Sequence, residues 1–222
     1  MDAYHWDFSF LAGYNNALLQ GAAHTAYLSL TIMFFGMVIG GVFAGLASSN
    51  TTILRNISKL YVELFRNVPA LVMLFWFFYA IPIMTGIQNS RLLAASIAFS
   101  LYTGAYFCEI FRSGLQSIPR GQWEAARALG FSRKSMFITV IFPQMIKRIL
   151  PSLTNEIVEV VKISAVAATI AYPELLYQAQ LISDTEYRPV EAYTAIALIM
   201  TAGIMALSGV SHYVEYRMKR SD

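Results

Sequence analysis

Long stretches without charged side chains dominate the pattern of this sequence. No Asp, Glu, Lys or Arg occurs between Asp7 and Arg55, and the apolar part of that stretch runs from Thr25 to Ala47. The apolar core of a bilayer requires about 20 residues of helix and tolerates few unpaired charges along them. The pattern therefore predicts a membrane-spanning helix over residues 25–47.

Four further segments have a similar length and character, although one of them carries three charged residues. In the second span, Leu, Met, Phe and Trp are dense between Val68 and Met84, and we assign Tyr61 to Phe65 to the same helix. Together the segments predict an all-α polytopic membrane protein with about five transmembrane helices. The four remaining predicted spans cover residues 68–84, 92–111, 149–172 and 192–214.

Proline and glycine positions predict two local features of these helices. The segment 66–69, RNVP, interrupts the second span. Because proline lacks a backbone donor and disfavours helix in the residue before it, we expect a kink or a helix restart there. In the first span, Gly36 and Gly40 lie four residues apart, as do Gly41 and Gly45. Both pairs predict close packing of another helix of the same subunit.

The composition agrees with a membrane protein. AVILMFWYC residues make up 57% of the chain, DEKR residues only 13%, and the mean hydropathy is +0.53. These values exclude an ordinary water-soluble domain. The N-terminus lacks the basic region, short apolar stretch and small-residue cleavage site of a secretory signal, so we expect the first span to be retained. The single cysteine, Cys108, lies in the third span and can form no internal disulfide.

Basic residues are unevenly distributed among the connections between spans. Because cytoplasmic connections are enriched in Lys and Arg, the connection between spans three and four and the C-terminus are predicted to face the cytoplasm. The N-terminal segment with Asp2 and Asp7 is then predicted to face outward, as is the acidic connection between spans four and five. The net charge of +3 therefore reflects topology and not nucleic-acid binding. The cytoplasmic basic residues are Arg112, Arg120, Arg127, Arg133, Lys134, Lys147, Arg148, Arg217, Lys219 and Arg220.

The connection between spans three and four has the marks of ordered structure. Its segment 118–130 reads IPRGQWEAARALG. Pro119 suits the first turn of a helix, and Gly130 suits a helix C-terminus, where a positive φ angle is favoured. A short helix with both ends marked is therefore expected.

A second helical stretch follows directly. Ser132 is a candidate N-cap for a helix from Arg133 to Phe142. Pro143 and Pro151 are then expected to bend the chain toward the membrane. A helical pair is thus expected below the bilayer.

One motif in this connection resembles the hallmark of a known family. Glu124-Ala125-Ala126 is followed by Gly130 and then by Val140-Ile141-Phe142-Pro143. This order resembles the Glu-Ala-Ala, three residues, Gly and downstream Ile-x-Leu-Pro of the permease subunits of ATP-binding-cassette importers, with apolar exchanges at two positions. The physical roles fit, because small alanines let a helix seat closely in the cleft of another protein and the glycine ends that helix.

The resemblance extends over nearly the whole chain and narrows to the polar amino-acid branch of that family. The chain departs from the branch at Ile163, where a polar Asp or Asn often follows the lysine. A substrate contact made there in relatives therefore does not carry over. The supporting stretches are 65–69 (FRNVP), 109–122 (EIFRSGLQSIPRGQ), 155–156 (NE) and 173–176 (PELL).

The resemblance implies a single transmembrane permease domain over residues 1–222, with a cytoplasmic coupling region at 118–143 within it. It implies import of polar amino acids across the bacterial inner membrane by alternating access, with the N-terminus outside and the C-terminus cytoplasmic. The implied partners are a cytoplasmic ATP-binding-cassette ATPase dimer, a second permease subunit, identical or homologous, and an extracytoplasmic amino-acid-binding protein. The residues implied to couple the chain to the ATPase are Glu124, Ala125, Ala126 and Gly130.

Three charged residues inside the fourth span are candidates for the substrate pathway. Glu156, Glu159 and Lys162 follow one another at three-residue steps, so all lie near one helix face. Each would cost about 2.5–3.5 kcal/mol at mid-membrane unless paired or hydrated. We therefore expect them to face the subunit interior or a polar cavity. Glu159 with Lys162 is the natural structural ion pair, and Glu156 is the better candidate for substrate contact, although a structural role for it stays open.

The sequence disfavours two rival classes. A membrane enzyme would need a reactive group and a base, yet His5, His24 and His212 are predicted at membrane edges or in tails, and there is no Gly-x-Ser-x-Gly elbow. The nearest approach to a phosphate-binding loop, Arg133-Lys134-Ser135, lacks the required glycines. We therefore expect no enzyme activity, cofactor or metal in this chain, with ATP and Mg bound by the partner ATPase. The alternative function is an ion-coupled secondary amino-acid carrier, but the chain shows no duplicated half of the kind those folds carry.

Overall fold

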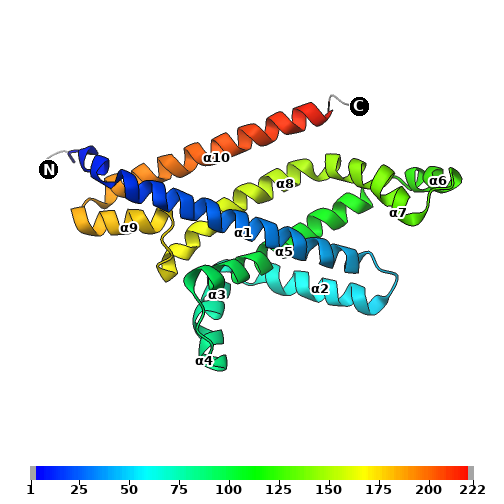
Figure 1. Ribbon diagram of the computed structural model, residues 1–222, viewed down its shortest axis with the longest axis horizontal. Helices are drawn as coiled ribbons and strands as arrows, with labels where there is room; N and C mark the ends of the chain where they lie inside the picture. The colour runs from blue at the N-terminus through cyan, green and yellow to red at the C-terminus, as the bar shows by residue number, and fades with distance from the viewer. Residues whose placement is uncertain (1–3, 220–222) are drawn as a thin grey trace. The chain divides into compact units, whose positions relative to one another are not determined.

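The described part of the chain is helical throughout. A computed structural model describes residues 4–219, and every regular element in this range is a helix (Figure 1). This confirms the all-α prediction; Asp2 and Arg220, used in the charge argument, lie outside the described residues. The α-helices are α1 (Asn15–Ala47), α2 (Thr52–Asn67), α3 (Ala70–Phe75), α4 (Ile81–Thr85), α5 (Arg91–Gln116), α6 (Arg120–Ala128), α7 (Arg133–Met136), α8 (Phe142–Ser164), α9 (Leu175–Glu186) and α10 (Pro189–Lys219). The 3-10 helices are η1 (Ser9–Tyr14) and η4 (Ala165–Ile170), and the π turns are η2 (Trp76–Ala80) and η3 (Phe137–Ile141).

The number of membrane spans agrees with the prediction. Three helical stretches are long and apolar enough to cross a membrane, and up to five spans result if each of two broken helix pairs is counted as one. The first span begins earlier than predicted, because the stretch from Asn15 to Thr25 contains no proline or charge that would interrupt a helix. His24 lies inside α1, and its predicted position at a membrane edge stays a prediction.

The second predicted span is broken where the proline motif predicted a restart. Helix α2 ends at Asn67, Val68 is extended with φ −89° and ψ 129°, and α3 begins at Ala70. The ring of the following proline excludes helical geometry at Val68. The assignment of Tyr61 to Phe65 to the same helix as residues 68–84 was wrong, because these residues belong to α2. Helix α2 is amphipathic and carries charged residues along one side: Arg55, Lys59, Glu63 and Arg66.

The chain divides into two compact units, each built from three separate segments. The first unit contains the chain up to Ile32, Ala70–Phe99 and Glu159–Leu207. The second contains Met33–Pro69, Ser100–Val158 and the chain from Ser208 on. Each unit has its own packing contacts and is described separately.

In the first unit, α9 lies beside the N-terminal part of α1 (Figure 1). The hydroxyl of Thr25 accepts a hydrogen bond from the backbone N–H of Leu175 at 3.1 Å. The buried carboxylate of Glu174 accepts the N–H of Tyr177 at 2.8 Å and so caps α9. The apolar cluster of this contact contains Leu18, Ala22, Leu175, Ala179, Ile196 and Met200.

The N-terminal segment of the first unit is fastened to the start of α10. The buried carboxylate of Glu191 accepts hydrogen bonds from the hydroxyl of Tyr4 and from Arg188, the latter at 3.1 Å. This contact raises the pKa of the Tyr4 hydroxyl, because the neighbouring carboxylate opposes its ionisation. Hydrogen bonds from Ser9 lower the pKa of Asp7. The segment before η1 is therefore held by charge-assisted hydrogen bonds.

In the second unit, two glycines of α1 allow α5 to approach closely. A Cβ atom at Gly40 would lie 2.5 Å from Cβ of Phe107 and 2.9 Å from the backbone nitrogen of Cys108. A Cβ atom at Gly36 would lie 2.6 Å from the hydroxyl of Thr103. The predicted close packing is thus confirmed for Gly36 and Gly40.

The same prediction was wrong for Gly41 and Gly45. A Cβ atom at either position would meet nothing within 4 Å in the described chain. One residue turns the side-chain direction by about 100° around a helix. Gly41 therefore points away from the contact that its neighbour Gly40 makes.

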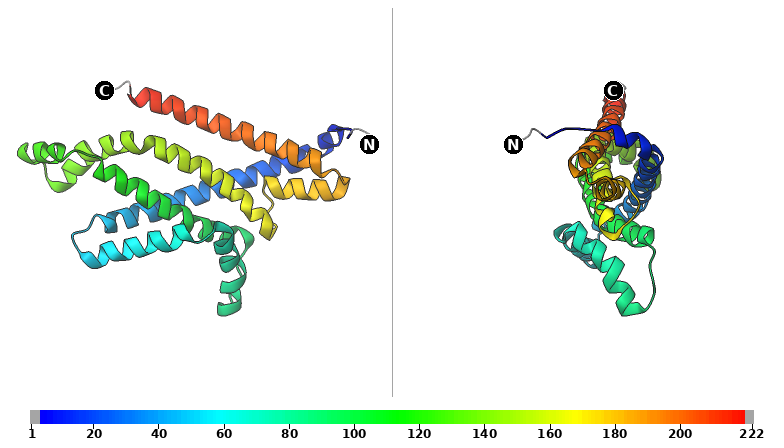
Figure 2. Two further views of the ribbon diagram at one scale, coloured as in Figure 1. Left: turned by 180° about the vertical axis from the view of Figure 1, so that it is seen from behind. Right: turned by 90° about the vertical axis from the view of Figure 1, so that its left-hand side faces the viewer.

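Helix α2 packs beside the C-terminal part of α1 in this unit (Figure 2). The rings of Phe43 and Tyr61 stack with centroids 3.8 Å apart. The hydroxyl of Ser58 donates to the carbonyl of Phe43 at 2.8 Å, and that of Tyr61 donates to the carbonyl of Leu101 at 2.7 Å. Helix α2 is thereby joined to both α1 and α5.

The predicted helix from Arg133 to Phe142 does not end at Pro143. The hydroxyl of Ser132 accepts the N–H of Ser135 at 3.3 Å, which confirms the predicted N-cap. Helix α7 then continues through the π turn η3 into α8, with Pro143 in its first turn and Pro151 inside it. The wider π turn just before Pro143 is consistent with a proline that lacks a donor for the preceding turn.

Candidate coupling surface and charged sites

Helix α6 ends in a turn that depends on Gly130. This glycine has a φ angle of +78°, and its N–H donates to the carbonyl of Arg127 at 2.9 Å. The N–H of Phe131 donates to the carbonyl of Ala126 at 3.2 Å. These two bonds form a Schellman motif with its left-handed residue at Gly130, which confirms the predicted positive φ angle.

One face of α6 is buried and fixes its orientation. Ala126 is only 3% exposed, and half-buried Trp123 and Phe131 pack against the same cluster. This cluster joins α6 to the helices on either side of it in the chain. Its buried members are Ile118, Ala126, Met136, Ile141, Met145 and Ile149.

The other face of α6 is exposed and carries the rest of the motif. Glu124 and Ala125 are exposed, and Leu129 is 78% exposed at the end of the helix. The structure therefore divides the predicted coupling residues: Ala126 and Gly130 shape the helix, whereas Glu124 and Ala125 are available to a partner. Sequence reasoning missed Leu129, because an apolar residue beside a helix-ending glycine usually packs inward.

Polar contacts tie this surface to α8. The side-chain amide of Gln144 donates to Oε1 of Gln122 at 3.1 Å. Arg148 donates to the backbone carbonyl of Ser117, which precedes α6. Apolar packing and hydrogen bonds therefore join α6 and the residue Ser117 before it to α8.

The structure places the three charged residues of the predicted substrate pathway along α8. Nζ of Lys162 lies 2.7 Å from Oε1 of Glu159, which confirms the predicted ion pair. The side chain of Lys162 is 51% exposed and that of Glu159 is 62% exposed. The expectation that they face the interior of this subunit was therefore wrong, whereas a position in a polar cavity stays open. Glu156 is half-buried and has an interaction partner of its own. A role for Glu156 in substrate contact stays a prediction.

The exposure of this ion pair leads to a testable expectation. Glu159→Gln is expected to lower the free energy of unfolding in detergent by no more than about 1 kcal/mol, because exposed pairs contribute little. Thermal unfolding of the purified chain measures the change. The matched control is Glu63→Gln, which breaks the exposed pair between Lys59 and Glu63 at 3.6 Å. A loss several times that of the control would contradict a hydrated position for Glu159.

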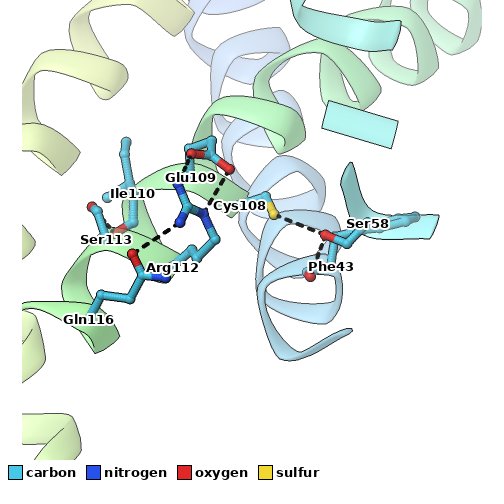
Figure 3. Close-up of polar contacts among 8 residues, drawn as sticks. All are labelled: Phe43, Ser58, Cys108, Glu109, Ile110, Arg112, Ser113 and Gln116. Atoms are coloured by element: carbon cyan, nitrogen blue, oxygen red, sulfur yellow. Dashed lines mark hydrogen bonds and ion pairs between the residues drawn. The ribbon is translucent and has the colours of Figure 1, made fainter. Parts of the chain in front are cut away.

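A second charged group lies in the second unit (Figure 3). The sequence did not predict that its residues come together. Arg112 donates to the carboxylate of Glu109, with Nε 3.0 Å from Oε1, and to Gln116 at 3.0 Å. Sγ of the buried Cys108 lies 3.7 Å from the hydroxyl of Ser58 on α2. The residues 109–122 were noted only as a matching stretch, because the sequence does not reveal that α2 lies opposite them.

This group borders a cavity of about 480 Å³. The cavity is lined by the end of α1, the polar side of α2 and the Glu109–Arg112 turn of α5. Its lining includes four cationic and two anionic side chains, namely Arg55, Lys59, Arg66, Arg112, Glu63 and Glu109.

Comparison with known proteins identifies the relatives of this chain. Residues 26–220 match the family described as "Binding-protein-dependent transport system inner membrane component". The chain is 41% identical over 186 residues to the probable amino-acid ABC transporter permease protein YckA of Bacillus subtilis, covering 83% of this chain and 81% of that protein. It is 32% identical over 203 residues to the probable glutamine ABC transporter permease protein GlnM of Bacillus subtilis, covering 91% and 94%.

Solved structures agree with these relatives. The fold matches a chain in the crystal structure of an amino acid ABC transporter with histidines, with a TM-score of 0.89, 30% identity, and coverage of 96% of this chain and 100% of that one. It also matches a chain of the MetNI methionine ABC transporter in an inward-facing conformation, with a TM-score of 0.79 and 19% identity over 93% and 98% of the two chains. The second likeness concerns the fold alone.

Proposed function

The chain belongs to the family of binding-protein-dependent transport system inner membrane components, and from this premise we propose that it is the transmembrane subunit of an ATP-driven importer of polar amino acids. The observation that carries the substrate class is the 41% identity to an amino-acid permease over most of both chains. The 30% identity to a chain of a solved amino acid transporter supports the same class. Membership of the family makes the protein a multi-pass component of the inner membrane.

We propose that the exposed face of α6 is the surface through which ATP hydrolysis drives this subunit. A separate cytoplasmic ATPase dimer binds ATP and Mg, and exposed Glu124, Ala125 and Leu129 lie against it. Small Ala125 permits close approach, and apolar Leu129 fills a pocket of the partner. Closure of the ATPase dimer moves α6, and the contacts of Gln144 and Arg148 pass the movement to α8.

The proposed transport cycle is alternating access. Two permease subunits, identical or homologous, switch between inward-open and outward-open arrangements as the ATPase closes and opens. An extracytoplasmic binding protein delivers the amino acid to the outward-open form. Glu156, on the same helix α8 that receives the movement of α6, is the proposed contact for the ammonium group or a cationic side chain of the substrate.

Reconstitution tests this function directly. The chain is co-purified with its partner ATPase and binding protein and placed in liposomes, and uptake of a panel of labelled amino acids is measured. ATP-dependent uptake that also requires the binding protein is expected. Uptake driven by a proton or sodium gradient without ATP would instead identify the ion-coupled carrier.

The proposed topology places the N-terminus outside and α6 inside, because basic residues concentrate in the connection that contains α6. Single cysteines are introduced at exposed Ser9 and Arg133 in a chain carrying Cys108→Ala. A membrane-impermeant thiol reagent is expected to label position 9 in intact cells and position 133 only after the membrane is opened. Labelling of position 133 from outside would reverse the topology.

A further inference from the structure

We propose that the cavity of the second unit binds the phosphate group of an anionic membrane lipid. The cavity lies between the polar side of α2 and the Glu109–Arg112 turn of α5, and its volume is about 480 Å³. Neither α6 nor the charged residues Glu156, Glu159 and Lys162 contribute to its lining. The site is therefore separate from the proposed coupling surface and substrate pathway.

The charge of the cavity favours an anion. Two of its cations are already matched, since Lys59 lies 3.6 Å from Glu63 and Arg112 bonds to Glu109. Among the residues that the structure describes, no carboxylate lies within ion-pair distance of Arg55 or Arg66. The cavity thus carries a surplus of two positive charges.

Arg55 and Arg66 form no ion pair among the described residues, although the charge of Arg66 also acts on Glu109, and both arginines are held in place with free donors. Arg55 donates to the hydroxyl of Thr52 at 3.2 Å and to the carbonyl of Ser49 at 3.5 Å, and the guanidinium of Arg66 lies 4.9 Å above the ring of Tyr106. A guanidinium has five N–H donors, so most of them stay available. Two such planar groups suit the several oxygens of a phosphate better than the single carboxylate of an amino acid. A zwitterionic amino acid also has no net charge to match the surplus.

An apolar stripe of α2 that adjoins the cavity at Asn56 and Glu63 supplies the argument for a lipid. Four large apolar residues there are exposed at the spacing of one helix face: Ile53, Ile57, Leu60 and Leu64. In a membrane protein such a stripe suits acyl chains. Asn56 and Glu63, which line the cavity, are helical neighbours of Leu60 at spacings of four and three residues. The stripe and the cavity are therefore continuous around α2, as one lipid molecule requires.

Lipid titration followed by native mass spectrometry tests the site. The full chain in detergent is titrated with phosphatidic acid and, for comparison, with phosphatidylcholine of the same acyl chains. Arg55→Gln/Arg66→Gln is expected to weaken phosphatidic acid binding by about tenfold or more, because hydrogen bonds to charged groups are lost. The matched control Arg91→Gln/Arg217→Gln removes two exposed arginines outside the cavity and is expected to retain binding.

Further arms separate the ligand sources. Arg55→Lys/Arg66→Lys keeps the charge without the planar donors, and it is expected to bind phosphatidic acid with intermediate strength. This variant provides the test if the glutamine variant does not fold. Inorganic phosphate that binds as tightly as phosphatidic acid would overturn the lipid assignment. Displacement of the lipid by free amino acids would make the cavity a solute site, and equal lipid binding by all variants would place the lipid elsewhere.

Discussion

Gly40→Ala is expected to destabilise the second unit by about 1–3 kcal/mol, the usual cost of overpacking a tight contact. The added Cβ would lie 2.5 Å from Cβ of Phe107 and 2.9 Å from two backbone atoms of α5, at Cys108 and Gly104. Backbone atoms cannot rotate away as a flexible side chain can, so α1 and α5 must separate. Thermal unfolding of the purified chain in detergent measures the loss.

The neighbouring glycine provides a matched control. Gly41→Ala adds the same methyl group one residue along the same helix, where nothing lies within 4 Å. Alanine is favoured over glycine in a helix by roughly 0.8–1.0 kcal/mol, so this variant is expected to be as stable as the parent chain or more stable. Equal stability of the two variants would show that α1 and α5 are not in close contact in the folded chain.

Gly130→Ala is expected to abolish most ATP-driven transport while leaving insertion into the membrane intact. The left-handed conformation with φ +78° costs a residue with a Cβ about 1–2 kcal/mol, although nothing lies within 4 Å to clash with it. The end of α6 is therefore expected to unwind, which displaces Leu129 from the surface proposed to meet the ATPase. Uptake and substrate-stimulated ATP hydrolysis are measured in reconstituted complexes.

Two variants test whether the effect depends on the left-handed conformation of Gly130 or on replacing any glycine of α6. Gly121→Ala changes a glycine in the same helix that has neither a positive φ angle nor a close neighbour, and normal transport is expected. Gly130→Asn is expected to retain more transport than Gly130→Ala, because asparagine tolerates the left-handed conformation better. Normal coupling in Gly130→Ala would refute the proposed role of this turn.

Local signals in the sequence predicted local structure well. The Gly130 turn, the Ser132 cap and the helix restart before Ala70 were all predicted, because each depends on a few adjacent residues with restricted backbone geometry. The number of spans was also predicted, since apolar length alone determines it.

Features that depend on which helices meet were predicted less well. Gly36 and Gly41 are indistinguishable in the sequence, yet only the first meets α5. The sequence predicted a restart near Pro69 but did not identify the amphipathic helix α2 before it, because only Tyr61 to Phe65 of this helix were assigned to a span. The cavity was missed for the same reason, since Arg66 and Glu109 are distant in the chain and the packing of α2 beside α5 brings them together.

The π turn between α7 and α8 determines how α6 and α7 are rotated relative to α8. A π turn holds one residue more than the α-helical turn it replaces, and one residue corresponds to about 100° of rotation. In a regular α-helix, the side chains of Met136 and Met145 would point in different directions. The extra residue of the π turn brings them to the same side, and both are buried in the same apolar cluster. Deleting one residue within Phe137–Ile141 would restore a regular helix but turn α6 and its exposed face by about a quarter of a circle relative to α8. The extra residue thus sets the direction in which the surface proposed to meet the ATPase points.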